Sequence, residues 1–343
     1  MADNIRVVLA GCGSISGVWL ENVADIRDVE IVGLVDINEA AANERKKTFQ
    51  LDNAAIGTKL APMLEETEPN VVFDCTVPET HVDVAVTALE HGCHVLGEKP
   101  LADTMENAKK ICAAAKDARR IHAVLQNRRY DPNIRALRKY LGSGKMGDLT
   151  TLDCDFYIGA HFGGFRDHMK HVLLIDMAIH TFDAARFIAD ADPVSVYCHE
   201  WNPKGSWYDH DASAVAVFEM SNGIVYTYRG SWCSEGLNTT WECDWRAISE
   251  KGSITWDGSE NFKAQRVAGA GSFFSEWEDV HIKPVKMRGK VGHAGVIEEF
   301  LRCVRSPTPK KPLTACSDNI KSLAMVFGAV ESAETGKKVK IKI

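Results

Sequence analysis

A lysine beside a proline, directly after a short apolar run, is the first residue whose type and position suggest chemistry. The run at residues 95–96 leads to Glu98, Lys99 and Pro100. A lysine ammonium is a compact donor with a pKa that moves readily on burial, so it can hold and polarise a substrate hydroxyl group. A surface lysine at a strand end would give the same pattern. The position of Lys99 in the fold therefore decides between the two interpretations.

Asp176 and His180 are a second candidate group, because they lie four residues apart in an otherwise apolar helical segment. This spacing places two side chains on one face of a helix, so carboxylate and imidazole can act on a single substrate. Histidine, with an ordinary pKa of about 6.5, suits a general base at neutral pH. A helix-stabilising Asp–His pair is the alternative interpretation.

A glycine-rich turn follows the first expected strand. Residues 11–16 read Gly-Cys-Gly-Ser-Ile-Ser and match the dinucleotide fingerprint, except that Ser16 holds the third glycine position. The first glycine permits a tight turn, and the second lets the backbone approach a pyrophosphate. Asp36, at the end of the second expected strand, can accept both ribose hydroxyl groups and would repel a 2′-phosphate. Because residues 37–38 offer no arginine, the sequence favours NAD over NADP as cofactor.

The elements that must position these residues alternate in type along the first third of the chain. Expected strands cover residues 5–10, 29–35, 54–56, 71–76, 94–96 and 121–125, and expected helices cover residues 15–26, 39–49, 82–91 and 105–118, with a short helix near 63–64. Such alternation indicates parallel strands joined by crossover helices. We therefore expect an α/β domain over residues 1–125 with a doubly wound parallel sheet. Lys99 then follows its fifth strand.

The pattern changes after residue 125. Longer expected strands cover residues 149–158, 194–199, 212–220, 224–232 and 240–248, and expected helices cover residues 132–140, 173–188, 294–304 and 317–333. Asn222-Gly223 is a strong hairpin signal, because both residues tolerate positive φ. Residues 258–290, rich in glycine, serine and charge, are expected to form long loops. We expect an α+β domain over residues 126–343, with helices on one face of a largely antiparallel open sheet.

Composition excludes several classes of protein. The 343 residues are 45% hydrophobic and 25% charged, which is typical of a soluble globular chain. A net charge of -7 without long basic runs argues against nucleic acid as a partner. No apolar segment approaches the length of a membrane span, and no export signal is visible. Ten cysteines without C-x-x-C spacing fit a reducing cytoplasm.

Four motifs together make the chain resemble the glucose-fructose oxidoreductase and inositol dehydrogenase (Gfo/Idh/MocA) family over nearly its whole length. They are the glycine turn, Thr76-Val77-Pro78-Glu79-Thr80-His81, Glu98-Lys99-Pro100 and Asp176-x-x-x-His180. The resemblance implies an N-terminal Rossmann domain and a catalytic group made of Lys99, Asp176 and His180. It also implies that Pro100 is commonly cis, which would aim Lys99 at the nicotinamide. One departure is the segment 170–174, where many members are rich in glycine.

The expected cofactor-binding residues combine the glycine turn with positions that the resemblance adds. They are Gly11, Gly13, Ser14, Ile15, Asp36, Thr76, Pro78, His81, Glu98, Lys99 and Asn127. The resemblance places the threonine-proline loop and the segment 126–130 beside the cofactor.

The expected function is an NAD(P)-dependent dehydrogenase of a sugar, sugar derivative or cyclic polyol. His180 would remove a hydroxyl proton while the carbon passes hydride to the nicotinamide, Lys99 would stabilise the developing negative charge on the oxygen, and Asp176 would orient the substrate. An NAD-recycling glycosidase and a non-catalytic cofactor-binding regulator remain alternatives. Expected partners are a small carbohydrate-like substrate and further copies of the chain, as a homodimer or homotetramer, through the uncovered sheet face.

Three weaker signals stay open. His168 and His171 could lie on one side of a helix, but without a cysteine cluster we expect no metal site. The second signal is a group of aromatic residues that could stack on a sugar or pack in the core: Trp201, Trp207, Tyr208, Trp232, Trp241 and Trp245. The basic residues Arg166, His168 and Lys170 could contact a polar or anionic substrate or form a solvated loop.

Overall fold

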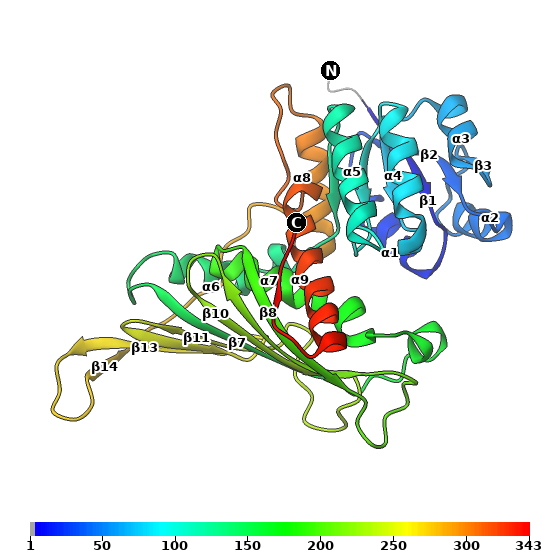
Figure 1. The fold of residues 1–343 in the computed structure, drawn as a ribbon. Coiled ribbons are helices and arrows are strands. Elements are labelled where there is room, and N and C mark those ends of the chain that lie inside the picture. The colour runs from blue at the N-terminus through cyan, green and yellow to red at the C-terminus, as the bar shows by residue number, and fades with distance from the viewer. Residues whose placement is uncertain (1–3) are drawn as a thin grey trace. The chain divides into compact units, whose positions relative to one another are not determined.

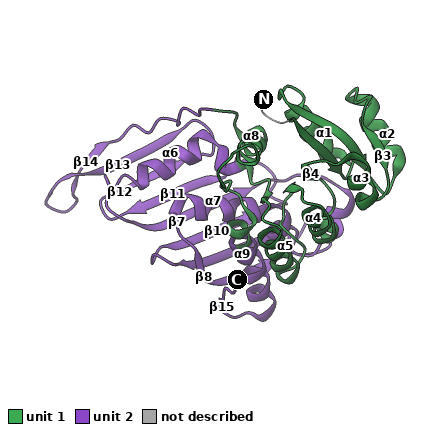
Figure 2. Cartoon of the chain, turned by 90° about the horizontal axis from the view of Figure 1, so that it is seen from above, with its two compact units in different colours: residues 1–127, 289–320 green, residues 128–288, 321–343 purple. Residues whose placement is uncertain are grey.

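A computed structural model describes residues 4–343, and they form two compact units (Figure 2). The first unit contains the residues up to 127 together with 289–320, and the second contains 128–288 with 321–343. We had expected 289–320 in the second domain. This segment joins the first unit because helix α8 (Gly292–Val304) buries Val296, Ile297, Phe300 and Leu301 and packs against α1 and β5.

The first unit is built on a parallel sheet of six strands in the order β3-β2-β1-β4-β5-β6 (Figure 1). These strands are β1 (Ile5–Ala10), β2 (Val29–Val35), β3 (Ala55–Gly57), β4 (Val71–Asp74), β5 (His94–Gly97) and β6 (His122–Val124). Its other helices are α1 (Ser14–Val23), α2 (Glu39–Thr48), α3 (Leu60–Thr67), α4 (His81–Glu90) and α5 (Met105–Asp117). The central strands are buried on both faces, which is why they are continuous apolar runs. The expected doubly wound sheet is confirmed.

The second unit is built on a sheet of nine strands in the order β14-β13-β12-β11-β7-β10-β9-β8-β15. They are β7 (Leu149–Tyr157), β8 (Pro193–Trp201), β9 (Ser213–Met220), β10 (Val225–Ser231), β11 (Asp244–Ser249), β12 (Gly252–Trp256), β13 (Phe262–Gly269), β14 (Glu276–Asp279) and β15 (Val339–Lys340). All neighbours are antiparallel except β7 and β10, so the largely antiparallel sheet is confirmed. The hairpin signal at 222–223 joins β9 to β10, with φ +82° at Gly223.

Helices cover one face of this sheet and leave the other open (Figure 1). They are α6 (Pro132–Leu141), a π-helical segment (Leu173–Ala178) that continues as α7 (Ile179–Ala189), and α9 (Cys316–Thr335), which enters the second unit at residue 321. On the covered face Phe182 packs edge-to-face on Phe218 and Tyr228, with ring centroids 4.8 and 5.3 Å apart. This aromatic layer fixes α7 on the sheet.

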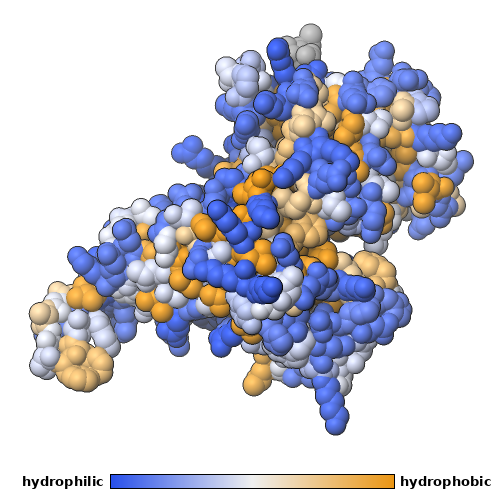
Figure 3. Space-filling model, viewed as in Figure 1, coloured by the Kyte–Doolittle hydropathy of each residue, from blue (hydrophilic) through white to orange (hydrophobic). Residues whose placement is uncertain are grey.

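The expectation of long loops over 258–290 is wrong for part of that range, because β13 and β14 form a hairpin there. β13 is mostly exposed and β14 entirely so, and their polar sequences therefore lack the apolar alternation of a half-buried strand. The connecting loop exposes the rings of Phe273 and Phe274, and hydrophobic side chains gather at this tip (Figure 3). Across residues 4–343 no helix is long and apolar enough to cross a membrane.

Candidate active site

The glycine turn lies between the carboxyl ends of β1 and β4, where the order of strands reverses. Gly11 has φ +86°, and a Cβ there would lie 2.6 Å from the backbone carbon and oxygen of Cys75. Only glycine fits this position. Gly13 is the N-cap of α1 and carries no capping side chain, and the first turn holds no acidic residue. The free N–H groups of α1 are thus left for an anion.

Asp36 lies beside this turn at the end of β2. Its Oδ2 accepts a hydrogen bond from the Cys12 backbone N–H at 2.7 Å, and its Oδ1 accepts one from Asn38 N–H at 2.7 Å. Burial, with the nearby Asp36 carboxylate, raises the pKa of the Cys12 thiol to about 12. Cys12 is therefore a neutral packing residue, and Asp36 keeps lone pairs for hydroxyl groups of a ligand.

The expected loops after β4 and β5 are held together by His81. Its Nδ1 lies 2.9 Å from the Pro100 oxygen, and its Nε2 lies 3.2 Å from the Thr76 oxygen. Thr76 donates from its hydroxyl to Asp74 at 2.5 Å. Thr76 and Pro78 thus lie at the same sheet edge as Pro100, and the Lys99–Pro100 peptide bond is cis.

Glu98 is buried and does not face solvent as an ordinary strand-end residue would. Its Oε1 accepts a hydrogen bond from the Trp19 indole at 2.7 Å, and its Oε2 accepts one from the Lys99 backbone N–H at 3.2 Å. Lys99 itself is partly exposed. These contacts hold the backbone of Lys99 in place at the carboxyl end of β5.

Asp176 and His180 lie in the second unit, where the π-helical segment meets α7. Both are partly exposed, whereas 172–174 and 177–179 are buried. Asp176 forms an ion pair with Arg166, whose Nε and Nη2 lie 2.8 and 3.3 Å from its carboxylate oxygens. The helix therefore leaves both residues only partly accessible: the Asp176 side chain is 13% exposed, and the Nδ1 of His180 is buried.

The loop before this helix carries an aromatic and basic group. The Arg166 guanidinium lies 5.0 Å from the ring centroid of Phe162 and 4.7 Å from that of Phe165. Phe162 packs edge-on against buried Trp232 and lies near Trp241, which is half exposed. Of the six aromatic residues singled out above, Tyr208, Trp232 and Trp245 are core residues. Trp241 lies beside Phe162, and Trp207 stacks on the ring of His161 with centroids 3.7 Å apart.

The histidines of this region pair with separate carboxylates. His161 Nε2 lies 2.9 Å from Glu235, His168 Nδ1 lies 2.6 Å from Asp209, and His171 Nδ1 lies 2.6 Å from Glu200. Hydrogen bonds to these carboxylates raise the pKa of His168 and of His171. Within residues 4–343 no group of three or more histidine, cysteine, aspartate or glutamate side chains could hold a metal ion.

The segment 126–130 divides between the units. Arg128 and Arg129 are buried in the second unit, where Arg129 binds Asp183 through two hydrogen bonds of 2.7 Å. Gln126 and Asn127 belong to the first unit. Both side-chain polar atoms of Gln126 and the Oδ1 of Asn127 are buried without a hydrogen-bond partner among the described residues. Buried polar atoms are normally paired, so they suit a polar ligand or water.

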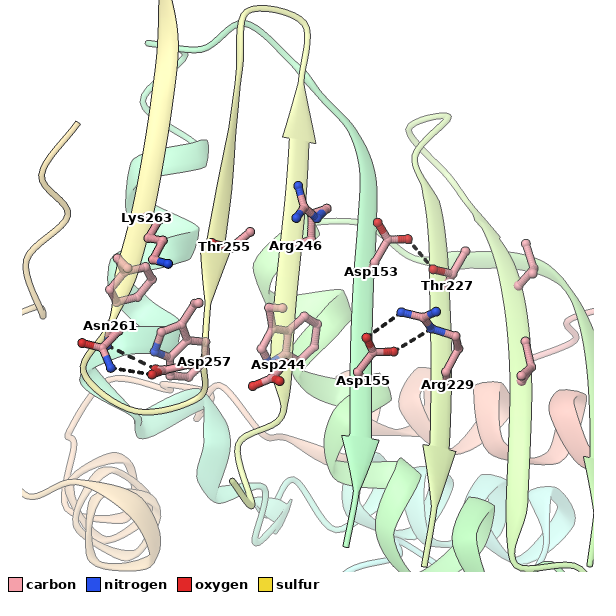
Figure 4. A pocket seen from close by; sticks show the side chains of 15 residues that line it. Asp153, Asp155, Thr227, Arg229, Asp244, Arg246, Thr255, Asp257, Asn261 and Lys263 are labelled. Carbon is pink, nitrogen blue, oxygen red and sulfur yellow. Dashed lines mark hydrogen bonds and ion pairs between the residues drawn. The ribbon is translucent and has the colours of Figure 1, made fainter. Parts of the chain in front are cut away.

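The open face of the nine-stranded sheet is hollowed, and several side chains that line the hollow form hydrogen bonds and ion pairs with one another (Figure 4). Arg229 forms two hydrogen bonds with Asp155, at 2.7 and 2.6 Å, and Thr227 bonds Asp153. This hollow lies on the face opposite α7 and so contains none of the expected site residues.

Arg45 is a residue that the sequence expectations missed. It lies on α2, and its guanidinium bonds Gly13 and Ser16 in the glycine turn. Ile37 and Val77 were missed as well; they are 96% and 60% exposed, beside Asp36 and Pro78 respectively. The sequence feature that could have identified them is an apolar residue in each loop that follows a parallel strand.

The expected cofactor residues therefore all lie in the first unit, around one edge of its sheet. Of the three expected catalytic residues, Lys99 is at that edge, and Asp176 and His180 share a helix of the second unit.

Comparisons with known proteins identify the family. Residues 5–126 match the model of an oxidoreductase family with an NAD-binding Rossmann fold, and residues 134–255 match the GFO/IDH/MocA C-terminal domain. The chain is 24% identical to inositol 2-dehydrogenase of Rhizobium meliloti, covering 98% of this chain and 99% of that protein. It is 25% identical to 1,5-anhydro-D-fructose reductase of Ensifer adhaerens, covering 97% and 98%.

A solved structure shares the fold of the whole chain. An oxidoreductase from Agrobacterium radiobacter, determined in complex with NAD+, L-tartaric acid and magnesium, superposes with a TM-score of 0.85 at 19% identity, covering 98% of each chain. Both units and both matched models thus point to one family. The chain belongs to the GFO/IDH/MocA family of NAD-binding oxidoreductases.

Proposed function

We propose that the protein is an NAD-dependent dehydrogenase that oxidises a secondary hydroxyl group or the anomeric carbon of a sugar, sugar derivative or cyclic polyol. The observation that carries this proposal is the partial exposure of Asp176 and His180 in a helical segment whose residues 172–174 and 177–179 are buried. An accessible carboxylate and an accessible imidazole on one helix suit contact with a polar ligand. The relatives named for inositol and anhydrofructose support a carbohydrate-like substrate.

The residues of the first unit fit a nicotinamide dinucleotide. The turn at Gly11 tolerates no side chain, and the start of α1 is open to a pyrophosphate. Asp36 can accept the ribose hydroxyl groups, and exposed Ile37 offers an apolar surface for the adenine ring. The buried Oδ1 of Asn127 can accept a polar group of the ligand. The carboxylate of Asp36 supports NAD over NADP, because it would repel a 2′-phosphate.

Each proposed catalytic residue has a separate task. His180 accepts the proton of the substrate hydroxyl group as the C–H bond of the same carbon breaks. Lys99 donates a hydrogen bond to that oxygen and stabilises its negative charge until the carbonyl has formed. Asp176, held by Arg166, orients a neighbouring hydroxyl group. NAD, when bound, accepts the hydride, so the products are a carbonyl compound, NADH and the proton on His180.

The direct test is to assay a panel of sugars, sugar acids and inositols with NAD+ and NADP+, following NADH absorbance. We expect His180→Ala and Lys99→Ala each to lower kcat by about a hundredfold or more, and His180→Ala to leave the Kd for NAD+ near normal. Near-normal turnover in either variant would contradict its assignment. Product release without net NADH would identify the glycosidase alternative, and NAD+ binding without turnover of any compound would identify the regulator.

We also propose that the open sheet face is covered by a second copy of the chain. This face carries charges of both signs, among them Asp244, Arg246 and Lys263, and exposes apolar Val217 and Tyr197 at 38% and 48%. Two copies related by a two-fold axis can pair such charges. Light scattering should report at least a dimer, and Val217→Arg should shift it to monomer. Glu66→Arg, exposed in the first unit, is the control; a monomeric wild-type protein refutes the proposal.

A further inference from the structure

Arg45 links α2 to the first turn of α1. Its Nε donates a hydrogen bond to Ser16 Oγ at 2.9 Å, and its Nη2 donates one to the Gly13 carbonyl oxygen at 3.0 Å. The side chain is partly buried and passes close to Gly17, where a Cβ would lie 3.8 Å from Nη1. A long basic side chain is thus fixed at the glycine turn by two directed contacts.

These contacts fix the peptide plane between Gly13 and Ser14. The Gly13 oxygen receives three donors: Ser16 N–H at 3.2 Å, the Ser16 hydroxyl at 2.6 Å, and Arg45 at 3.0 Å. A carbonyl oxygen has two lone pairs, so three donors leave it little freedom to turn. In a trans peptide the oxygen and the following N–H point in opposite directions. Holding the oxygen of Gly13 therefore aims the N–H of Ser14 away from Arg45, at the open start of α1.

The same contacts accommodate the departure from the glycine fingerprint. Ser16 stands where the fingerprint has its third glycine, which permits close packing of helix on strand. Its side chain is fully buried, and a buried hydroxyl group without a partner would be destabilising. Here the hydroxyl donates to Gly13 and accepts from Arg45. Serine at this position is thus matched to an arginine on the next helix.

We propose that Arg45 is a positioning residue for the pyrophosphate of the dinucleotide: with Ser16 it holds the Gly13–Ser14 peptide so that the Ser14 N–H faces the phosphate. This inference rests on the proposed cofactor. Two of the N–H donors of Arg45 are directed at the glycine turn, so this role does not depend on a 2′-phosphate. Its charge adds to the positive potential at the start of α1.

The test is the affinity of Arg45→Ala for NAD+, measured by calorimetry. We expect Kd to rise about tenfold, which corresponds to about 1.4 kcal/mol, because the Ser14 N–H is no longer held toward the pyrophosphate. The affinity of the variant for ADP-ribose, which keeps the pyrophosphate, should fall by the same factor. Its affinity for adenosine should not fall. With saturating NAD+, kcat should stay within about twofold of wild type. Lys47→Ala, an exposed change on the same helix with the same loss of charge, should bind NAD+ normally.

Two further variants separate positioning from folding and from direct recognition. Arg45→Lys keeps the charge but cannot bridge both acceptors, so its Kd should lie between those of wild type and Arg45→Ala. Ser16→Gly combined with Arg45→Ala should lose less affinity than the product of the two single losses, because both residues act on one carbonyl group. If the free-energy losses of the two single substitutions simply add in the double variant, Arg45 and Ser16 do not act on the same carbonyl group.

The following results overturn the inference: NAD+ affinity unchanged in Arg45→Ala, an equal loss in Lys47→Ala, or a loss confined to NADP+. The last result would make Arg45 a direct 2′-phosphate contact. A wild-type protein that binds NAD+ but oxidises no substrate would contradict the proposed reaction without affecting these binding measurements.

Discussion

Asp183→Asn is the substitution whose effect on stability follows most directly from the structure. Asp183 lies on α7 with no solvent exposure and accepts three hydrogen bonds: two of 2.7 Å from Arg129 and one of 2.6 Å from Ser322. The substitution replaces one acceptor oxygen by an amide NH2 that faces a donor. It also removes the negative charge that Asp183 places beside the guanidinium of Arg129, a residue that is 5% exposed.

Removing one partner of a buried ion pair costs about 3–5 kcal/mol. Asparagine keeps one acceptor oxygen, so we take the lower end, about 3 kcal/mol. The matched control is Asp190→Asn, which breaks a 2.8 Å pair with Arg138 in which the aspartate side chain is 80% exposed. Such surface pairs contribute at most about 1 kcal/mol. Asp190 has φ +50°, which asparagine tolerates, so the control adds no backbone strain.

The assay is urea unfolding followed by tryptophan fluorescence. Seven of the eight tryptophans lie between residues 201 and 277, so the signal reports the second unit, which contains Asp183 and Asp190. With an m-value of about 2–3 kcal/mol/M, the midpoint should fall by about 1 M for Asp183→Asn and by less than about 0.5 M for the control. Equal shifts in the two variants would refute the reasoning that burial, and not the pair itself, sets the cost.

Two further predictions concern pH and the glycine turn. The hydrogen bond to Glu200 raises the pKa of His171, so protonated His171 stabilises the fold. This stabilisation is fully present below the ordinary histidine pKa of about 6.5 and is lost as pH rises above it. The urea midpoint should fall over that range, and His171→Asn, which suits φ +53°, should flatten the fall; parallel curves contradict this. Gly11→Ala should abolish NAD+ binding and lower the thermal midpoint of unfolding, because the new Cβ would meet the Cys75 backbone. Gly13→Ala should fold normally, because a Cβ there has nothing within 4 Å, and it should bind NAD+ weakly.

Local patterns were enough to predict most of the first unit. Its strands are short apolar runs because both sheet faces are covered, and its alternating strands and helices indicate a doubly wound parallel sheet. The four-residue spacing also predicted that Asp176 and His180 belong to one helical segment. In each case the deciding interactions lie within a few residues of one another.

Contacts between distant residues could not be predicted. Trp19 and Glu98 are 79 positions apart, and nothing local in either indicates that the indole binds the carboxylate. Arg45 resembles any basic residue of an exposed helix until α1 is placed beside it. Strands β13 and β14 were missed for another reason: a mostly solvated hairpin needs no apolar alternation.

Because residues 289–320 belong to the first unit, this unit cannot fold completely early in synthesis. The backbone of Val124 on β6 bonds Thr314 at 3.0 Å, Ala123 pairs with Ala315, and α8 packs on α1. An N-terminal fragment ending near residue 125 therefore lacks part of its own core and should be prone to aggregation. During synthesis, the ribosome must release residues up to about 320 before this unit can close. The second unit, also split in sequence, begins to emerge before the first is complete.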